Sequence, residues 1–266
     1  MIFIRDSKIE SNFVRGFGLV RDYQIIKTDY KMNKSTVKEI RERFDRDVER
    51  FSNLDTGQVS TIDAALSLEL ITESAQRICP QATSLLDVGC GAGNYTIKML
   101  QKIPNLNCTL LDLSRPMLDK AFERVSAETR GEVSLIQGNL QEIDLPAGHY
   151  HIILAGAVLH HLREDADWEF VFARLYDALS PGGCLMISDL IRQDSEALND
   201  YFRERYRDYL TGTGGEEYQR NVFDYIEKED SPRSVFYQLD LMRRVGFRKM
   251  EVLHKNVCFA AYGGIK

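Results

Sequence analysis

The twelve residues from Leu85 to Thr96 constrain the fold of this chain of 266 residues more than any other segment. An apolar run reaches an acidic residue, three glycines follow at alternate positions, and a helix-like pattern then begins. Glycines let the backbone pass close to a ligand, and a helix N-terminus offers free N–H groups and the positive end of a dipole. The segment therefore predicts a strand, a loop and a helix that together cradle an anionic group of a cofactor.

The spacing of the glycines separates two classes of cofactor. Gly89, Gly91 and Gly93 follow the pattern G-x-G-x-G, whereas the dinucleotide fingerprint is G-x-G-x-x-G, which argues against an NAD-binding oxidoreductase. Asp87 precedes the first glycine by two positions, at the carboxyl end of the expected strand. There its carboxylate can accept a hydrogen bond from an ammonium group or from N–H groups of the loop. The pattern D-x-G-x-G-x-G resembles the first motif of class I S-adenosylmethionine (SAM) methyltransferases.

Further motifs occur in the order that this resemblance implies. Asp112 ends a second apolar run, where a carboxylate can accept hydrogen bonds from both ribose hydroxyls. Leu113 and Met117 follow, and either can pack on the adenine. Asn139 and Leu140 end a third run, and the family usually carries Asp at the position of Asn139. The turn into the fifth strand has the family's pattern L-x-P-G-G. The resemblance implies these cofactor-binding residues: Asp87, Gly89, Gly91, Gly93, Asp112, Leu113, Met117, Asn139, Leu140 and Ala155.

The fold class follows from the order of the patterns. Short β-rich runs alternate with helical stretches near residues 94–102, 116–128 and 166–179. Such alternation predicts a parallel sheet covered by helices on both faces, with ligands bound at the carboxyl ends of the strands. Two late runs, Arg248–Val252 and Val257–Tyr262, supply a reversed final hairpin. The resemblance thus implies an α/β, Rossmann-like class I methyltransferase fold, with a mostly parallel seven-stranded sheet and helices ahead of the first strand.

The same patterns divide the chain into parts. Residues 1–33 show no clear period and are expected to be a poorly ordered extension, while residues 34–266 form the methyltransferase domain. Within it, residues 191–235 form a helical insert between the fifth and sixth strands, where substrate specificity is often determined. A glycine-rich break at Thr211–Gly215 predicts a hinge between two insert helices, and Ser231 predicts the N-cap of the helix that follows.

The composition bounds the partners and the compartment. A formal net charge of −6 and a pI near 5.5 offer no basic field, so nucleic acid is not expected as a direct partner. The sequence contains no run of eighteen apolar residues, so we expect no membrane association. Five scattered cysteines without C-x-x-C spacing predict reduced thiols and a cytoplasmic location. A small molecule is the expected substrate, and a homodimer is compatible with these features.

Polar side chains near the expected sulfonium are the candidates for catalysis. His160 and His161 follow the fourth strand, where an imidazole can act as a general base near neutral pH; alternatively, one caps the strand and the other packs under the adenosine. Asp189 ends the fifth strand and can orient a substrate or stabilise a turn. Tyr206 and Tyr209 of the insert can line a pocket for the acceptor or pack in a core.

A pair of histidines on the fourth strand raises the question of a metal. His149 and His151 share one face of that strand. They lie at its amino end, opposite the cofactor, and no acid or thiol completes a set of ligands. The sequence therefore predicts no metal site.

The insert resembles one family in particular, the carboxy-SAM synthases. That family replaces the SAM methyl group with a carboxymethyl group and acts in the pathway that modifies a tRNA wobble uridine. There an arginine of the second insert helix holds the new carboxylate, and Arg220 stands at the matching place; the alternative is a surface or ion-pairing arginine. The glycine loop and the His160–His161 pair are of the general methyltransferase type. We therefore expect transfer of the SAM methyl group to a small molecule, with S-adenosyl-L-homocysteine (SAH) as product. Carboxy-SAM synthesis and a non-catalytic SAM-binding regulatory module are the alternatives.

Overall fold

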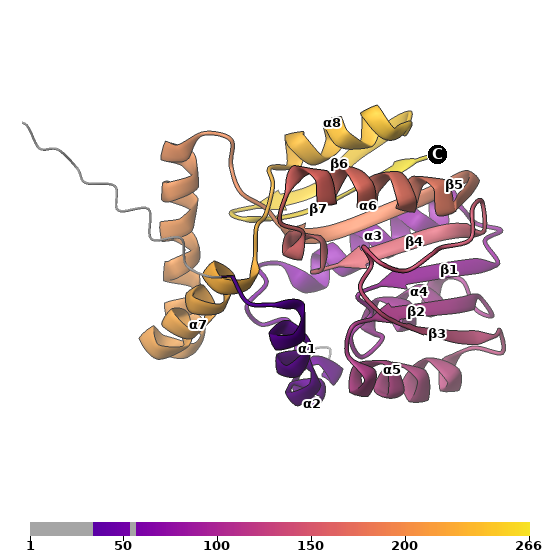
Figure 1. Cartoon of the computed structure of the whole chain (residues 1–266), viewed down its shortest axis with the longest axis horizontal. Helices are drawn as coiled ribbons and strands as arrows, with labels where there is room; N and C mark the ends of the chain where they lie inside the picture. Colours follow the sequence, from indigo (N-terminus) through magenta and orange to yellow (C-terminus); the bar gives the residue numbers. More distant parts are fainter. Residues whose placement is uncertain (1–33, 54–56) are drawn as a thin grey trace, which may run out of the picture. The chain divides into compact units, whose positions relative to one another are not determined.

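A computed structural model describes residues 34–53 and 57–266, so the extension expected over residues 1–33 lies outside the described residues. Within the described part of the chain, one sheet has the strand order β3-β2-β1-β4-β5-β7-β6 (Figure 1). The first five strands are parallel, and β7 runs antiparallel between β5 and β6. The strands are β1 (Ser84–Val88), β2 (Asn107–Asp112), β3 (Val133–Gln137), β4 (Tyr150–Gly156), β5 (Leu179–Leu190), β6 (Lys249–Asn256) and β7 (Phe259–Ile265).

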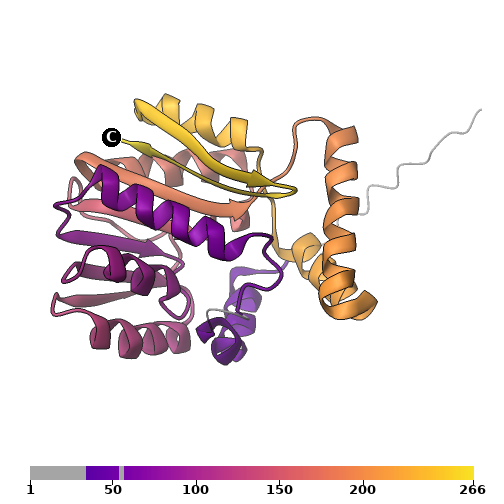
Figure 2. The ribbon, with the colours of Figure 1, turned by 180° about the vertical axis from the view of Figure 1, so that it is seen from behind.

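Helices cover both faces of the sheet. Figures 1 and 2 show α6 and α8 on one face and α3, α4 and α5 on the other. The helices are α1 (Val37–Arg46), α2 (Val48–Ser52), α3 (Ala64–Ile78), α4 (Asn94–Lys102), α5 (Arg115–Glu128), α6 (Asp165–Ala178), α7 (Glu196–Glu229) and α8 (Val235–Val245), with a short 3-10 turn η1 (Leu159–His161). This arrangement confirms the predicted Rossmann-like methyltransferase fold.

Two hydrophobic cores explain why the central strands are apolar along their whole length. Successive side chains of a strand point to opposite faces, and a sheet covered on both sides buries both sets. Leu85 and Ile152 pack with α3, α4 and α5, whereas Leu86 and Ile153 pack with α6 and α8. All four side chains are fully buried. The carboxyl ends of these strands are thereby fixed side by side at one edge of the sheet.

The N-cap of α8 differs from the sequence prediction. Ser234, not Ser231, caps this helix, because the Ser234 side chain accepts a hydrogen bond from the backbone N–H of Tyr237 at 3.1 Å. The backbone N–H of Ser231 instead donates a hydrogen bond to the carbonyl of His160 at 2.7 Å. This long-range hydrogen bond fixes the end of the insert against η1, and no local sequence pattern reports it.

The insert is helical, as predicted, but its break is narrower than expected. The helical conformation continues through Thr211–Gly214, and only Gly215 leaves it, with φ 81° and ψ 179°. One half of α7 projects away from the sheet (Figure 1). Among residues 34–53 and 57–266, no helix is both long and apolar enough to cross a membrane.

A third, smaller cluster of buried side chains anchors the insert. Its members come from both halves of α7, from the strand ends and from the segment before α3. They are Ile62, Leu190, Tyr206, Leu210, Val222, Phe223 and Phe259. In addition, the hydroxyl of Tyr206 donates to the carbonyl of Ser60 at 2.7 Å, and the hydroxyl of Tyr209 donates to the carbonyl of Val59 at 2.8 Å. The insert therefore has a core of its own against the domain.

Replacing Leu210 by alanine tests this anchoring. Leu210 is fully buried in the third cluster, so Leu210→Ala should lower the free energy of unfolding by about 2–5 kcal/mol. Leu198, on the same helix, is 53% exposed, and Leu198→Ala should change stability by less than about 0.5 kcal/mol. Urea unfolding of both variants measures the difference. Equal, small effects would mean that the insert does not pack on the domain.

Candidate functional site

The glycine loop after β1 forms one wall of a cavity of about 300 Å³ at the carboxyl ends of the strands. Gly89 and Gly91 both have positive φ, 64° and 50°, a conformation that side chains disfavour. A Cβ on Gly89 would lie 2.6 Å from Val158, whereas a Cβ on Gly91 would project into open space. Gly93 has φ 83° and forms the N-cap of α4. We call this space, lined by Gly89–Ala92, the glycine-loop cavity.

Two buried carboxylates hold this loop in place. The Asp112 carboxylate accepts hydrogen bonds from the backbone N–H groups of Gly91 at 2.9 Å and Ser114 at 2.8 Å. Burial raises the pKa of Asp112. The Asp87 carboxylate accepts from the N–H of Thr96 at 3.2 Å and from its hydroxyl at 2.7 Å, and burial raises the pKa of Asp87 to about 7. Asp112 lines the cavity, while Asp87 supports the first turn of α4 behind it.

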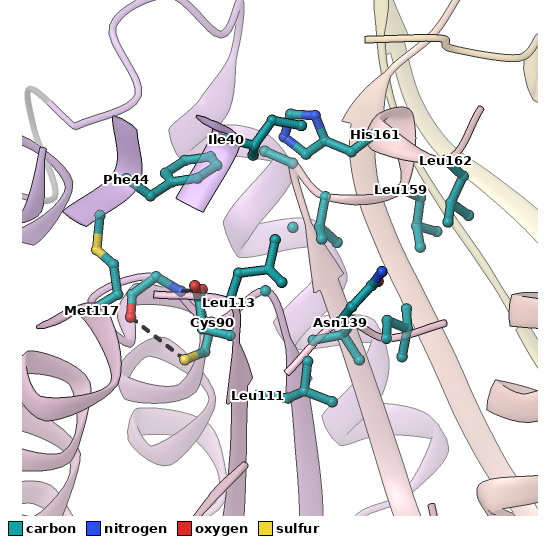
Figure 3. A pocket seen from close by; sticks show the side chains of 18 of the residues that line it. Ile40, Phe44, Cys90, Leu111, Leu113, Met117, Asn139, Leu159, His161 and Leu162 are labelled. Carbon is teal, nitrogen blue, oxygen red and sulfur yellow. Dashed lines mark hydrogen bonds between the residues drawn. The ribbon is translucent and has the colours of Figure 1, made fainter. Parts of the chain in front are cut away.

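Apolar side chains line the remainder of the glycine-loop cavity. Leu113, Met117 and Leu140 lie where the sequence placed them, and Asn139 lies among them with its carbonyl oxygen accepting from the N–H of Gln141 at 3.1 Å. Figure 3 shows Met117 and Leu113 on the side of the glycine loop and Asn139 across from them. This apolar slot with a polar side chain at one end suits a flat nucleobase.

Three of the residues predicted to bind the cofactor do not line the cavity, namely Asp87, Gly93 and Ala155. Ala155 is fully buried in a core, and Gly156 and Ala157 line the cavity in its stead. The reason is that β4 continues to Gly156, so the residue that faces the cavity comes after the strand end. A Cβ on Gly156 would lie 2.6 Å from the Tyr95 ring, so this glycine also makes room for Tyr95.

The helices ahead of β1 cover the cavity. Ile40 and Phe44 of α1 line it together with His161 (Figure 3). The Asn94 side chain donates to the carbonyl of Phe51 at 2.9 Å, which ties α2 to the start of α4. Ile40 and Phe44 were not among the site residues predicted from the sequence.

A second cavity of about 100 Å³ adjoins the first and extends beneath the insert. Tyr206, Tyr225 and Ile226 of α7 line it, so we call it the insert cavity. The residues common to both cavities are Phe44, Phe51, Gln58, Tyr95, Ala157 and His161. The two spaces thus meet at the end of β4.

A histidine and a carboxylate form a buried pair in the wall of the insert cavity. The Asp189 carboxylate accepts from the His160 backbone N–H at 3.0 Å and also bonds its Nδ1. Burial lowers the pKa of His160, but the charges of Asp189 and Asp230 outweigh this effect and raise it to about 9. These two carboxylates thus favour the protonated form of His160, and Asp189 holds its ring in place.

Asp230 is a site residue that sequence reasoning did not single out for chemistry. One of its oxygens lies 3.1 Å from His161 Nδ1 and 3.7 Å from His160 Nε2. Burial raises the pKa of Asp230, and the charges of the two histidines and Arg43 lower it further than burial raises it. Asp230 is the C-cap of α7. The position of Asp230 beside the histidines depends on the tertiary contact between the insert and η1, so no sequence motif predicts it.

The two histidines weighed as metal ligands in the sequence lie elsewhere. His151 Nδ1 bonds the Ser84 hydroxyl at 2.7 Å, and the His149 ring packs edge-on against Tyr150. Within the described residues, His160, His161 and Asp230 form a group that could hold a metal ion, because their potential ligand atoms all lie within 4.8 Å of one another.

The three substrate residues predicted in the insert lie in different environments. Tyr206 lines the insert cavity, whereas Tyr209 does not. The Arg220 side chain is 61% exposed, lies 3.5 Å from Glu216 and lines neither cavity. Its placement matches the surface, ion-pairing alternative, because Arg220 follows the kink at Gly215 and projects outward.

The strand order, the glycine loop and the cavity at the strand ends are those of the class I SAM-dependent methyltransferase fold. Residues 85–183 match the family model of a methyltransferase domain. The predicted class is thereby confirmed: the chain has the fold and the domain of a SAM-dependent methyltransferase, an enzyme class whose cofactor is SAM.

Similar proteins agree with this class. The carboxy-S-adenosyl-L-methionine synthases of Shewanella sp. strains W3-18-1 and ANA-3 are 25% and 26% identical over 206 residues, which is 75% of this chain and 82% of theirs. The structure of human N-acetylserotonin methyltransferase in complex with SAM has a TM-score of 0.58 at 14% identity and covers 87% of this chain. The chain spans 59% of that protein. A SAM-dependent methyltransferase from Mesorhizobium loti has a TM-score of 0.50 at 17% identity, over 73% of this chain and 96% of its own.

The raised pKa of Asp87 makes stability depend on pH. Between about pH 4 and pH 7 the folded protein keeps a proton that the unfolded chain releases, so stability falls as pH rises through this window. Asp87→Asn should remove this dependence, which amounts to at most about 1.4 kcal/mol per pH unit. Urea unfolding from pH 4 to pH 8 gives both curves. Parallel curves for the two proteins would show that Asp87 is ionised throughout.

Proposed function

We propose that this chain transfers the methyl group of SAM to a small-molecule acceptor bound in the insert cavity, with SAH as the product. The observation that carries the proposal is the junction of the two cavities. A cofactor along the glycine loop and an acceptor beneath the insert would meet at the residues that line both spaces, among them His161 and Tyr95.

Methyl transfer from a sulfonium requires little beyond alignment and exclusion of water. The electrophile is already activated, so the protein contributes mainly by holding the nucleophile in line with the methyl group. Phe44, Phe51 and Tyr95 surround the junction with aromatic rings, which excludes water there. The imidazole of His161 lines both cavities. We therefore assign to His161 the contact with the acceptor atom and the methyl group. His160 and Asp189 are positioning residues behind it.

The dimensions and charge of the site favour a small acceptor. The insert cavity has a volume of about 100 Å³ and is bounded on one side by α7, so it suits a compact molecule. The net charge of −6 disfavours a nucleic acid partner. We further propose that residues 34–266 form one methyltransferase domain and that it acts in the cytoplasm, because all five cysteines are free thiols.

Two substitutions at the glycine-loop cavity test the cofactor. Gly91→Val would place a side chain in the open space of the loop, and Asp112→Ala would remove the acceptor expected for the ribose hydroxyls. Asp112→Ala should cost roughly 2–4 kcal/mol of SAH binding free energy. Gly91→Val should abolish SAH binding in calorimetry at micromolar protein concentration.

A glycine outside the cavity provides the matched control. Gly148 also has positive φ, 63°, and open space at its Cβ position. Gly148→Val therefore imposes similar backbone strain without entering the cavity, and it should bind SAH as the wild type does. Unchanged SAH affinity in Gly91→Val and Asp112→Ala would remove SAM from this cavity.

Carboxy-SAM synthesis is the second candidate function. The similarity of this chain to the carboxy-SAM synthases of Shewanella, at 25–26% identity, supports it. The placement of Arg220 does not support it, because this side chain is exposed and its guanidinium faces Glu216. Binding of a carboxylated cofactor would need another cation near the sulfonium. Arg43 lines the insert cavity, but its guanidinium donates a hydrogen bond to the Glu229 carboxylate at 2.8 Å.

Arg220 distinguishes the two candidates. We expect Arg220→Ala to change the affinities for SAM and for carboxy-SAM by less than twofold, because the side chain lies outside both cavities. Arg205→Ala, also on the exposed surface of α7 at 58% exposure, is the matched control. Calorimetry with both cofactors on the three proteins decides. A selective loss of carboxy-SAM affinity in Arg220→Ala alone would favour the synthase.

A further inference from the structure

Three potential ligand atoms converge in the wall of the insert cavity. They are Nε2 of His160, Nδ1 of His161 and one carboxylate oxygen of Asp230. The Asp230 oxygen is 3.1 Å from the second histidine and 3.7 Å from the first. Ligands at 2.0–2.2 Å from one metal ion lie about 3.0–3.5 Å apart at angles of 90–110°. The separations of 3.1 and 3.7 Å are close to this range, and all three atoms lie within 4.8 Å of one another.

Two of these atoms are buried without a hydrogen bond. Asp230 Oδ1 and His161 Nδ1 have no hydrogen-bond partner among the described residues, although they lie 3.1 Å apart, because the geometry between them is not that of a hydrogen bond. The Asp230 side chain is only 2% exposed. A buried carboxylate oxygen without a donor is costly, so each such atom in a folded protein needs a partner. A cation between the three atoms would satisfy both orphaned groups at once.

The surroundings of His160 have the pattern of a metal ligand. Its Nδ1 is bound to Asp189, which fixes the ring and directs Nε2 toward Asp230. Histidines that bind metals commonly donate their other ring N–H to a carboxylate in this way. The nearest arginine, Arg43, does not occupy the position, because Glu229 binds it through two nitrogens.

We propose that His160, His161 and Asp230 bind one divalent transition-metal ion, with Asp189 orienting His160. Two imidazoles and one carboxylate suit zinc, iron, cobalt or manganese, whereas magnesium and calcium prefer oxygen ligands alone. Three protein ligands leave coordination positions open, and those positions face the insert cavity that all three residues line.

The ion defines the chemical class of the acceptor, and this step rests on the proposed methyl transfer. An acceptor with a hydroxyl or enol oxygen would bind the open position, and coordination would lower the pKa of that oxygen. The oxygen proton leaves to solvent. The oxygen then forms the new O–C bond with its electron pair, the S–C bond of SAM breaks, and its electron pair stays on sulfur as SAH departs.

Metal binding is measured directly, without turnover. Full-length, tag-free protein is treated with EDTA and titrated with Co²⁺, whose visible absorption reports nitrogen and oxygen coordination. We expect one Co²⁺ per chain. His161→Ala and Asp230→Ala should weaken Co²⁺ binding at least 100-fold, and Asp189→Asn, which alters only the orientation of His160, about 10–100-fold.

A second histidine–carboxylate pair provides the control. His254 Nε2 lies 2.8 Å from Asp63, and neither residue lines the cavities. His254→Ala should bind Co²⁺ like the wild type. If the buried Asp230→Ala does not fold, His161→Ala, whose side chain is 19% exposed, carries the test.

The outcomes separate the two proposals. Absence of stoichiometric Co²⁺ binding, or equal binding by wild type and His161→Ala, overturns the metal site. SAH calorimetry on the same samples tests the cofactor independently. SAH binding without Co²⁺ binding would support the methyl-transfer proposal and contradict the metal site. Co²⁺ binding without SAH binding would support the metal site and contradict methyl transfer.

Discussion

The hydrogen bond from Gly91 to the Asp112 carboxylate is the interaction on which the rest of the site depends. It joins the loop after β1 to the end of β2, and a further bond from Cys90 N–H to the Leu111 carbonyl at 3.0 Å secures the same junction. Because β1 to β5 are parallel, the loops after the other strands end at the same edge. They bring Asn139, the η1 histidines and Asp189 around one loop. The chemistry of the site is therefore a consequence of strand direction as much as of residue choice.

The insert completes this edge from the opposite side. Its end is tied to η1 through the Ser231 N–H and to the segment before α1 through Lys34, whose ammonium donates to the Glu227 carbonyl at 2.8 Å. Arg43 and Glu229 add a charged contact between α1 and α7. These contacts place Asp230 beside the histidines. The insert is thus part of the site wall as well as an addition to the sheet, and a large movement of its C-terminal end would break up the histidine–carboxylate group.

How much the sequence predicts depends on the range of the interactions involved. Gly89, Gly91, Asp112, Leu113 and Met117 line the predicted cavity because each follows a strand by a fixed, short offset. Asp230 was missed because its partners lie about 70 residues away and meet it only through packing of the insert. Ile40 and Phe44 were not among the predicted site residues, because their contact with the cavity is also long-range. Arg220 shows a different limit: its face on the helix depends on the kink at Gly215, and periodicity alone does not fix the direction after a kink.

Four of the buried acids form two pairs with different electrostatic roles. Asp112 accepts hydrogen bonds from backbone N–H groups, Asp87 accepts them from the backbone N–H and the hydroxyl of Thr96, and burial raises the pKa values of both acids. Asp189 and Asp230 face histidines, and the pKa of Asp230 is lowered. In the proposed reaction the sulfonium loses its positive charge as the methyl group moves, so uncompensated carboxylates would stabilise the reactant more than the transition state. A cation at the second pair, whether the His160 proton or a metal ion, offsets that charge. The same cation stabilises the deprotonated form of the acceptor oxygen, so it favours formation of the nucleophile before its negative charge is consumed in the new O–C bond.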